Sequence, residues 1–536
     1  MHSGRKRSTY AAGSQPALTS TRFPLEVSDM NDQLIILDTT LRDGEQAPGI
    51  ALSPDDKVAI AKQLAKLKVD IIEAGFAASS PGDFESVSRI AAEVDGPVIA
   101  SLARTHPDDI DQAADALKAA SQKRIHVFMS TSPIHMEQML RMTPDEVLAS
   151  VVEGVTRAKR YVEDVEFSPQ DATRSDPDFI VEVCRAAVAA GATTINIPDT
   201  VGFAMPEDFV ELLTKVFDDV RDGNEDVIIS THCHNDLGLA VANSLSAIHA
   251  GARQIEGAIN GIGERAGNTS TEEIIMALTT RADHFGVDIG ADTTEIFETS
   301  RLVSSLTGYP VQFNKAVVGR NAFAHESGIH QHGVLRNRET YEIMDPAAVG
   351  QTSTLVLGKH SGRAAFSDAL SKLEIHLDDE AFQRSFTRFK ELADRKGEIS
   401  EEGLKAIVAE ETGAIDHDMK LVSLHVAGGS HEAPIATVVL DKAGDTVTSS
   451  AEGDGMVNAA FVALQDAYGI AATLADYRVS PLESGADAMA KVNIIVQVGA
   501  TTYSGQGVST DVVEGSARAM VSALNKAASA KSDSAD

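Results

Sequence analysis

From Leu34 onwards, eight short runs of β-branched or apolar residues alternate with longer segments of helical periodicity. Such alternation is typical of repeated strand–helix units that share one parallel sheet. The runs are Leu34–Asp38, Asp70–Ala74, Val98–Leu102, Arg124–Met129, Asp164–Phe167, Thr193–Ile197, Val227–Thr231 and Gln254–Ala258. Eight units in succession predict a closed (β/α)8 TIM barrel. The prediction also restricts the active site, because barrel enzymes carry their catalytic loops after the carboxyl ends of the strands.

The segment between the first two runs carries the signals of a helix start. Ser53 is a good N-cap residue, and Pro54, Asp55 and Asp56 follow it with a fixed φ and two acids in the first turn. Apolar residues then recur at helical spacing as far as Leu67. We therefore expect a helix that begins at Pro54 and ends at Leu67.

The chain is too long for one ordinary domain, since it has 536 residues, of which 43% are apolar. We expect an α/β protein in which the barrel is followed by a helical connecting region and a C-terminal α/β regulatory domain. The predicted ranges are a disordered extension at 1–29, the barrel at 30–290, helical connecting subdomains at 291–415, the regulatory domain at 416–528 and a tail at 529–536. The basic, hydroxyl-rich extension has no convincing amphipathic pattern, which favours a flexible tail or an over-extended start above a transit segment.

The connecting region contains two loops rich in His, Gly and Ser, predicted at Asn321–Gly333 and Leu357–Arg363. A charged, helical segment follows at Glu391–Thr412. After it the pattern changes to strands and glycine turns.

The last part of the chain contains an internal repeat. In each copy two strands lead into a glycine turn and then an alanine-rich helix, which predicts a pseudo-symmetric α/β domain. The first copy is Ala436–Leu440, Thr446–Ser449 and Gly453-Asp454-Gly455, with a helix to Tyr468; the second is Val492–Val498, Thr501–Tyr503 and Gly505-Gln506-Gly507, with a helix after Thr510. The turns would bring helix N-termini together as a small-ligand site, although packing alone explains them equally well.

Charge and cysteine content exclude several classes of function. A net charge of −33 without clusters of Lys and Arg opposes binding to nucleic acid or anionic lipid. No apolar run approaches the roughly 18 residues that a membrane-spanning helix needs. Two cysteines cannot form a disulfide framework. We expect a soluble, cytoplasmic protein that binds neither nucleic acid nor membrane.

The strongest chemical signal is Thr231-His232-Cys233-His234-Asn235-Asp236, at the end of the seventh predicted strand. Residues two apart on a strand face the same side, so His232 and His234 should point together toward the barrel mouth. Two imidazoles so placed make half of a metal site. Cys233 faces the opposite side, which predicts a small buried apolar residue and not a ligand.

A lone His-x-His motif is weak evidence for a metal site, but two other loops are predicted to add ligands at the same end of the barrel. Asp43 follows the first strand within Asp38–Gln46, and it can complete a set of one carboxylate and two imidazoles suited to Mg²⁺, Mn²⁺ or Zn²⁺. The segment Asn260–Asn268 follows the last strand, and its glycine spacing does not match a dinucleotide-binding fingerprint. Asn268 could offer a neutral oxygen, and Glu264 could hold a neighbouring arginine or simply brace the loop.

The segments Asp38–Gln46, Thr231–Gly238 and Gly257–Asn268 resemble signatures of the acyl-CoA condensing synthases, a family that includes isopropylmalate, homocitrate and citramalate synthases. Hydroxymethylglutaryl-CoA lyases share part of this pattern. Within the family, Glu73–Phe76, Ser80–Glu85 and His126–Glu137 are most similar to the isopropylmalate synthases. The resemblance covers roughly residues 30 to 525.

The resemblance implies roles for individual residues. Those around the metal are Asp43, His232, His234 and Asn268; those in catalysis are Arg42, Glu166, His330 and Tyr341; those at the substrate are Gln46, Arg104, Thr200 and Glu264. The implied regulatory residues are Gly453, Asp454, Gly455, Gly505 and Gly507. The chain departs from the family pattern at Ala258, Met456 and Gly515, of which the last two put the feedback site in question.

The activity implied by the resemblance is the condensation of acetyl-CoA with 2-oxoisovalerate and water, which gives 2-isopropylmalate and CoA as the first committed step of leucine biosynthesis. It also implies a divalent metal, K⁺ as a candidate activator, leucine as feedback inhibitor and a homodimer. The residues fit this chemistry, because a metal can polarise the ketone of a 2-oxo acid while Arg42 stabilises the developing alkoxide.

Alternatives stay open at this point. Citramalate or homocitrate synthase would use another 2-oxo acid, and one methylene changes recognition by only about 1–3 kcal/mol. An acyl-CoA lyase and a non-catalytic amino-acid sensor are more remote. The C-terminal repeat argues against the lyase, and intact Asp43, His232 and His234 argue against the sensor.

Overall fold

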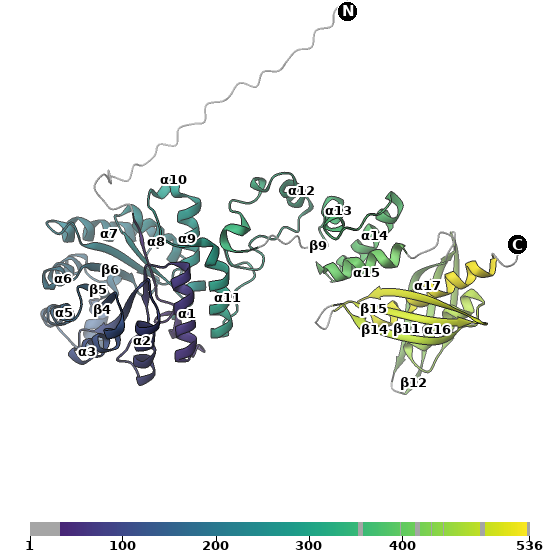
Figure 1. Cartoon of the computed structure of the whole chain (residues 1–536), viewed down its shortest axis with the longest axis horizontal. Helices are drawn as coiled ribbons and strands as arrows, with labels where there is room; N and C mark the ends of the chain where they lie inside the picture. The colour runs from purple at the N-terminus through teal and green to yellow at the C-terminus, as the bar shows by residue number, and fades with distance from the viewer. Residues whose placement is uncertain are drawn as a thin grey trace, which may run out of the picture. The chain divides into compact units, whose positions relative to one another are not determined.

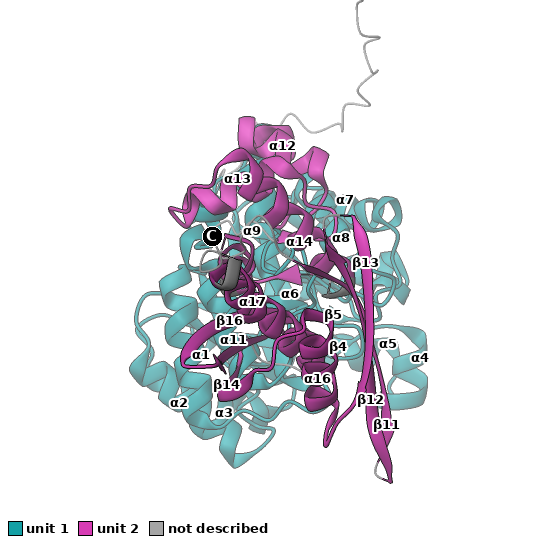
Figure 2. Ribbon diagram, turned by 90° about the vertical axis from the view of Figure 1, so that its right-hand side faces the viewer, with its two compact units in different colours: residues 1–322, 344–352 teal, residues 323–343, 353–536 magenta. Residues whose placement is uncertain are grey.

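The computed structural model describes residues 33–351, 357–396, 398–412, 419–429, 431–442, 444–482 and 488–532. The extension predicted at 1–29 lies outside these residues. The chain divides into two compact units, of which unit 1 comprises residues 1–322 and 344–352 and unit 2 comprises residues 323–343 and 353–536 (Figure 2). Each unit is described by itself.

Unit 1 is a closed barrel of eight parallel strands in sequence order, surrounded by helices (Figure 1). The strands are β1 Ile35–Asp38, β2 Ile71–Glu73, β3 Val98–Arg104, β4 Lys123–Ser130, β5 Asp164–Gln170, β6 Thr194–Asp199, β7 Ile228–Cys233 and β8 Gln254–Gly257. Ile35 to Asp38 of β1 pair with Gln254 to Gly257 of β8, and this ladder closes the barrel. All eight predicted strands and the barrel are confirmed.

Seven of the helices in unit 1 begin with proline, which fits the first helical position because its missing N–H would have no partner there. These are α1 Pro54–Leu67, α2 Pro81–Glu93, α3 Pro107–Ala116, α4 Pro133–His135, α5 Pro144–Lys159, α6 Pro177–Ala190 and α7 Pro206–Arg221. The others are α8 Ala240–His249, α9 Thr271–Thr280, α10 Ala282–Phe285 and α11 Ile296–Thr307. The predicted helix Pro54–Leu67 is confirmed at both ends, and Ser53 and Asp56 form a capping box.

The connecting helices of unit 2 are α12 Gly328–Arg336, α13 Arg363–Lys372, α14 Asp379–Lys396 and α15 Glu401–Thr412, with short paired strands β9 Leu357–Gly358 and β10 Glu398–Ile399. The predicted loop Asn321–Gly333 is wrong in its second half, where α12 begins at Gly328. The helical segment predicted at Glu391–Thr412 is interrupted, because β10 separates α14 from α15.

The C-terminal part contains the predicted internal repeat, but each copy has three strands and one helix, where two strands and one helix were predicted. One antiparallel sheet has the order β11-β12-β13, from strands Lys420–Gly429, Glu432–Lys442 and Asp445–Glu452, followed by α16 Met456–Tyr468. The other has the order β14-β15-β16, from strands Thr473–Pro481, Ala490–Val498 and Thr501–Ser509, followed by α17 Val512–Ser532. The first strand of each copy was not anticipated, and α17 runs past the tail boundary predicted at residue 528.

One glycine turn of the predicted pair does not form. Gly505 and Gly507 lie inside β16, where they pair with Ile494 and Val492 of β15. A Cβ atom at Gly505 would lie 2.0 Å from the carbonyl oxygen of Ala519, and one at Gly507 would lie 2.3 Å from that of Gly515. These glycines therefore allow α17 to pack closely against β16, and the turn prediction is wrong for this copy.

Helices α13 to α15 share a hydrophobic core with the C-terminal sheets. Phe366, Phe389 and Leu404 from the helices pack in one cluster with Met489 and Val508, which flank or belong to β15 and β16. Unit 2 thus holds together through apolar contacts between its helical and sheet parts.

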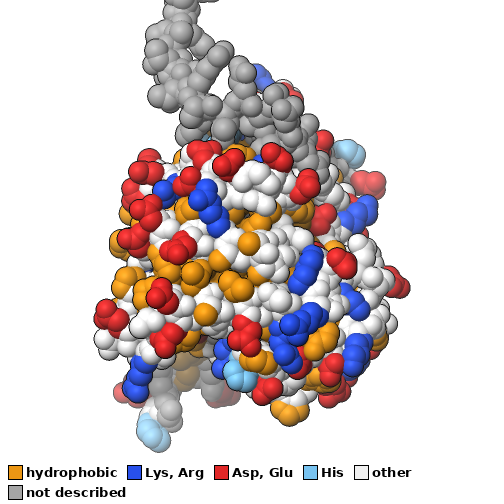
Figure 3. Space-filling model, turned by 90° about the vertical axis from the view of Figure 1, so that its left-hand side faces the viewer, with side chains coloured by type: hydrophobic (Ala, Val, Ile, Leu, Met, Phe, Trp, Pro, Cys, Tyr) orange, Lys and Arg blue, Asp and Glu red, His pale blue; other side chains and the backbone are white. Residues whose placement is uncertain are grey.

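The face of the molecule in Figure 3 carries acidic and basic side chains interspersed with apolar ones. Among the described helices, none combines the length and the apolar character that crossing a membrane requires.

Candidate active site

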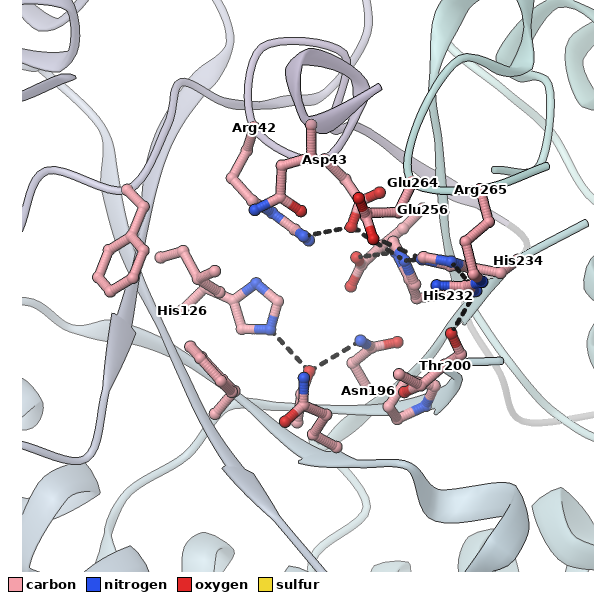
Figure 4. A pocket seen from close by; sticks show the side chains of 17 residues that line it. Arg42, Asp43, His126, Asn196, Thr200, His232, His234, Glu256, Glu264 and Arg265 are labelled. Atoms are coloured by element: carbon pink, nitrogen blue, oxygen red, sulfur yellow. Dashed lines mark hydrogen bonds and ion pairs between the residues drawn. The ribbon is translucent and has the colours of Figure 1, made fainter. Parts of the chain in front are cut away.

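A cavity of about 570 Å³ opens at the carboxyl ends of the barrel strands. Its walls come from strands β3 to β8 and from the loops after β1, β2 and β8 (Figure 4). Its lining includes Arg42, Asp43, Gln46, Phe76, His126, Phe128, Ser168, Asn196, Thr200, His232, His234, Glu256, Glu264 and Arg265. This is the face at which barrel enzymes carry their catalytic groups.

Asp43, His232 and His234 converge at one side of this cavity. The Nε2 atoms of the two histidines lie 3.0 Å apart, and Asp43 Oδ2 lies 3.8 Å from His232 Nε2 and 3.6 Å from His234 Nε2. One candidate ligand atom from each residue lies within 4.8 Å of the others. Sequence reasoning brought these three residues together, and the structure has them in one cluster.

The protonation states of this cluster suit metal binding. Burial lowers the pKa of His232 to about 4, so its imidazole is neutral near pH 7. The pKa of Asp43 lies well below its ordinary value, because Arg42 and the two histidines outweigh the effect of burial. A neutral imidazole and an ionised carboxylate are the forms that bind a divalent cation.

Asn268 adjoins Asp43 and adds an unused oxygen. Its Nδ2 donates to Asp43 Oδ1 at 2.8 Å and to the carbonyl of Ile262 at 3.0 Å, while its buried Oδ1 has no hydrogen-bond partner. A Cβ atom at Gly263 would lie 2.1 Å from Asn268 Nδ2, so this position requires glycine. One carboxylate, two imidazoles and an unpartnered amide oxygen fit a divalent metal.

The two histidines are held by neighbours from other loops. His232 Nδ1 lies 2.9 Å from Glu256 Oε2, a carboxylate contact that leaves Nε2 free to bind a metal. Arg265 Nη2 donates to His234 Nδ1 at 2.9 Å and to the carbonyl of Thr200. The same guanidinium forms a two-point ion pair with Asp236. Glu264 lines the cavity, but Asp236 is the carboxylate that holds Arg265.

Arg42 joins the metal cluster to the barrel interior. Its Nη1 donates to Asp43 Oδ2 at 2.5 Å and its Nε to Glu73 Oε2 at 2.6 Å. Arg42 and His126 lower the pKa of Glu73 although the carboxyl is buried. The guanidinium is therefore fixed in place at the cavity wall, where it can stabilise an anion without reorganising.

His126 lies beneath the mouth and is hydrogen-bonded through both ring nitrogens, to Glu73 Oε1 at 2.7 Å and to Ser168 Oγ at 2.7 Å. Burial opposes protonation, but Glu166 and Glu73 raise the pKa of His126 to about 9. Glu73, His126 and Glu256 also form a second group that could hold a metal. Because Arg42 and the His126 imidazolium already balance Glu73, this group needs no ion.

Glu166 lies deeper than the catalytic position implied by the resemblance. It is fully buried, binds Arg124 at 2.9 Å and Gln254 at 2.7 Å, and is not part of the cavity lining. Burial raises the pKa of Glu166 to about 7 and that of Glu256 to about 7. These two carboxyls, which contact each other, would hold about one proton near neutral pH.

Of the remaining residues to which the resemblance assigned roles, two line the cavity and the others do not. Gln46 and Thr200 line the cavity. Arg104 is exposed, pairs with Asp109 and lies over the Phe76 ring at 5.8 Å from its centroid. His330 and Tyr341 belong to unit 2, where their rings stack with centroids 4.1 Å apart, and their action at the barrel stays a prediction.

Cys233 is buried next to Thr231 and contributes no atom to the metal cluster, as strand alternation predicted. Burial raises the pKa of its thiol to about 12, so a thiolate ligand is disfavoured.

Sequence reasoning missed a polar layer beneath the mouth. It consists of Glu73, His126, Ser168, Asn196 and Glu256, all buried. The sequence did contain a signal for this layer. His126 and Phe128 on β4, like Ser168 and Gln170 on β5, are two residues apart and therefore face the same side of their strand. It was overlooked because inward positions of barrel strands are usually aliphatic.

Comparison with known proteins places this geometry in a family. Three family models match in succession: HMGL-like at residues 33–303, homocitrate synthase post-HMGL domain-like at 317–397, and LeuA allosteric (dimerisation) domain at 398–528. A solved hydroxymethylglutaryl-CoA lyase from Pseudomonas aeruginosa is 19% identical with a TM-score of 0.46, covering 53% of this chain and 95% of that chain.

Curated relatives match almost the whole chain. A 2-isopropylmalate synthase from Acidimicrobium ferrooxidans is 55% identical, with 93% of this chain and 96% of the relative covered. A 2-isopropylmalate synthase from Pelotomaculum thermopropionicum is 52% identical, with 93% and 99% covered. At this identity and coverage, the chain belongs to the 2-isopropylmalate synthase family.

Proposed function

We propose that this chain condenses acetyl-CoA with 2-oxoisovalerate and water, giving 2-isopropylmalate and CoA. The observation that carries the proposal is the convergence of Asp43, His232 and His234 beside Arg42 in a cavity at the barrel mouth. The family of the chain supports the choice of reaction.

Asp43, His232 and His234 would hold the divalent cation, with Asn268 Oδ1 as a further oxygen. When bound, such a cation polarises the carbonyl of a 2-oxo acid as a Lewis acid. Glu256 orients His232 for this role, and Arg265 orients His234.

Arg42 would stabilise the alkoxide that forms when the acetyl carbon attacks the ketone. Its charge is permanent, and Glu73 and Asp43 fix its position before substrate arrives. The His126 imidazolium adds a second positive charge at the cavity floor. These two cations suit a dianionic product in a chain whose net charge is −33.

A base must remove a methyl proton from acetyl-CoA before carbon–carbon bond formation. We assign this role to His330, with Tyr341 in support, because their stacked rings offer an imidazole and a phenol at one point of unit 2. Glu166 is too deep to touch the substrate, so we assign it to setting the charge of the inner layer.

The test is a thiol-release assay with acetyl-CoA, Mg²⁺ or Mn²⁺, and three 2-oxo acids in turn. We expect CoA release only when a 2-oxo acid is present, fastest with 2-oxoisovalerate. Preference for pyruvate or 2-oxoglutarate would identify a citramalate or homocitrate synthase instead. Cleavage of a preformed acyl-CoA without 2-oxo acid would identify a lyase.

The partners follow from the same proposal. The match to a LeuA allosteric (dimerisation) domain supports a regulated homodimer. We propose leucine as the feedback inhibitor, K⁺ as an activating ion and the cytoplasm as the location.

A further inference from the structure

The floor of the barrel cavity carries two neighbouring polar side chains, Ser168 of β5 and Asn196 of β6. Both line the cavity, and their exposed fractions are only 5% and 1%. Phe167 pairs with Ile195 in the register of these strands, so the next residues, Ser168 and Asn196, lie side by side.

This polar pair, Ser168 and Asn196, lies below the candidate metal cluster. His232 pairs with Pro198 of β6, and Asn196 precedes Pro198 by two residues on the same strand. Asn196 therefore faces the same side as Pro198, one step further from the open end of the barrel. Acetyl-CoA must approach from that open end, so a 2-oxo acid held at the cluster by its carboxylate and ketone extends its side chain toward the floor.

Ser168 Oγ accepts two hydrogen bonds and keeps its own proton for the cavity. Burial opposes protonation of His126, but Glu166 and Glu73 raise its pKa to about 9, so both ring nitrogens carry a proton near pH 7. His126 Nε2 therefore donates to Ser168 Oγ at 2.7 Å, and Asn196 Nδ2 donates to the same atom at 2.8 Å (Figure 4). A hydroxyl oxygen has two lone pairs, and both are used here. The hydroxyl proton of Ser168 is left to donate to a molecule in the cavity.

Asn196 supplies the complementary acceptor. Its Oδ1 is buried and, in the part of the chain that the structure describes, has no hydrogen-bond partner. Such atoms are rare in folded proteins, because burial removes the hydrogen bonds that water would make with them. A hydroxyl group matches the polar pair, since its oxygen can accept from Ser168 while its proton is donated to Asn196.

Apolar side chains also line this cavity. They are Phe76, Leu102, Phe128 and Pro198. The cavity therefore combines apolar walls for methyl groups with one point on its floor that can bind a hydroxyl.

We propose that this enzyme also condenses acetyl-CoA with 2-oxo acids that carry a hydroxyl group on C3, and that Ser168 and Asn196 bind this hydroxyl. The inference rests on the proposed function, because the reaction uses the same metal cluster and the same acetyl-CoA. With 2-oxoisovalerate, which has one hydrogen and two methyl groups on C3, the polar pair receives no partner from the substrate.

The reaction leaves the C3 hydroxyl unchanged. A proton leaves the methyl group of acetyl-CoA, and the resulting carbon nucleophile forms a bond with C2 of the 2-oxo acid. The ketone oxygen becomes an alkoxide, which takes up a proton. Water then breaks the carbon–sulfur bond of the thioester, giving a second carboxylate and CoA. The product therefore carries one oxygen atom more than 2-isopropylmalate, and neither an oxidant nor a reductant is needed.

The test compares two 2-oxo acids of the same shape in the thiol-release assay with the full chain. 3-Hydroxy-3-methyl-2-oxobutanoate carries the hydroxyl, and 3,3-dimethyl-2-oxobutanoate carries a methyl group in its place. We expect kcat/KM for the hydroxyl compound to exceed that for the methyl compound by at least about tenfold, because the methyl group leaves the buried donor and acceptor unpaired. Mass spectrometry of the product checks for the additional oxygen atom.

Two variants connect this preference to the polar pair. Ser168→Ala removes the donor, and Asn196→Leu replaces the amide with an apolar group of similar size. Each should lower the hydroxyl-to-methyl ratio at least about fivefold. The ratio within one variant cancels changes in folding or metal binding, which affect both compounds alike. Ser130→Ala is the matched control and should keep the ratio, because Ser130 is a buried serine that donates to Gln170 and does not line the cavity.

A ratio near one in the unaltered chain, or failure to turn over the hydroxyl compound, would overturn the inference. A ratio that Ser168→Ala and Asn196→Leu leave unchanged, or that Ser130→Ala lowers equally, would also overturn it. 2-Oxoisovalerate in the same assay tests the proposed function by itself. Its turnover without a preference for the hydroxyl compound would remove only this inference, whereas no CoA release with any 2-oxo acid would contradict both.

Discussion

At the scale of single residues, strand alternation decides which side chains reach the candidate metal cluster, because successive residues of a strand point to opposite sides. His232 near the end of β7 and His234 just after the strand both line the cavity, while Cys233 between them is buried and does not line it. Chemistry and packing are thus separated within three consecutive residues.

We expect His232→Ala and Asp43→Ala to lose bound metal and to reduce kcat by more than the roughly 10–100-fold typical of residues that only orient ligands. Both side chains lie at a cavity wall, so circular dichroism should report an intact fold. Cys233→Ala is the matched control, and it should keep normal metal content. Near-normal turnover of His232→Ala, or metal loss in Cys233→Ala, would contradict the assignment.

Lys57 is a buried residue that connects the loop after β1 to the neighbouring helices. Its side chain is 2% exposed, and its Nζ lies 2.5 Å from Glu45 Oε2 and 2.8 Å from Asp83 Oδ1. Glu45 follows Asp43, the proposed metal ligand, by two residues, so Lys57 ties the loop that carries Asp43 to α1 and α2.

Replacing Lys57 with Met should destabilise unit 1 by about 3–5 kcal/mol, because two partly buried carboxylates lose their partner. Metal affinity should fall with it, since Glu45 is released. The matched control is Lys62→Met on the same helix, because its ion pair with Glu93 is exposed to solvent and contributes little to stability. Adding Glu45→Gln to Lys57→Met should recover part of the stability, because Asp83 still lacks its partner, but not the metal affinity. Recovery of metal affinity would argue against a positioning role.

At the scale of elements, the glycines of β16 allow α17 to pack close to the strand. The alanine-rich face of α17 lies so near the strand that only hydrogen atoms fit between Gly505 and the helix. The apparent second copy of a ligand-binding turn is thus a packing feature.

We expect Gly507→Ala to lower the melting temperature of unit 2 through overpacking, which costs about 1–3 kcal/mol or more when backbone must move. Gly362→Ala is the control, because nothing lies within 4 Å of a Cβ atom there and its φ is negative. Thermal unfolding followed by differential scanning calorimetry distinguishes the two. A Gly507→Ala variant as stable as Gly362→Ala would show that α17 can shift without cost.

At the scale of the whole molecule, the candidate metal ligands and the repeated domain belong to different units. Asp43, His232 and His234 lie in unit 1, and the repeated βββα domain lies in unit 2. An effector bound in unit 2 can change activity only if it binds two states of the enzyme with different affinity.

We therefore expect leucine inhibition that is not competitive with the 2-oxo acid, and its loss when the residues after 416 are removed. Initial rates at varied 2-oxoisovalerate and fixed leucine provide the measurement. A purely competitive pattern would locate leucine at the barrel and contradict separate control. The truncated chain also needs a sedimentation measurement, because loss of a dimer would lower activity for another reason.

The sequence alone determined the barrel, the order of its strands and the grouping of Asp43, His232 and His234, because these depend on local periodicity and on which residues follow each strand. His232, His234 and Asp43 could be grouped once the eight units were counted. The α12 helix and the β16 glycines were misjudged, because glycine-rich segments form turns, helices or close packing according to their neighbours.

Only the tertiary structure decided which buried polar groups meet. Glu73, His126 and Glu256 come from β2, β4 and β8, and Glu166, which pairs with His126 in the register of β4 and β5, is buried and does not line the cavity. Arg388, Glu410 and Gln506 come together only when α14 and α15 pack on β16. The periodicity of the sequence predicts which side of its own strand or helix a side chain faces. Its contact partners depend on how elements that are distant in sequence pack together.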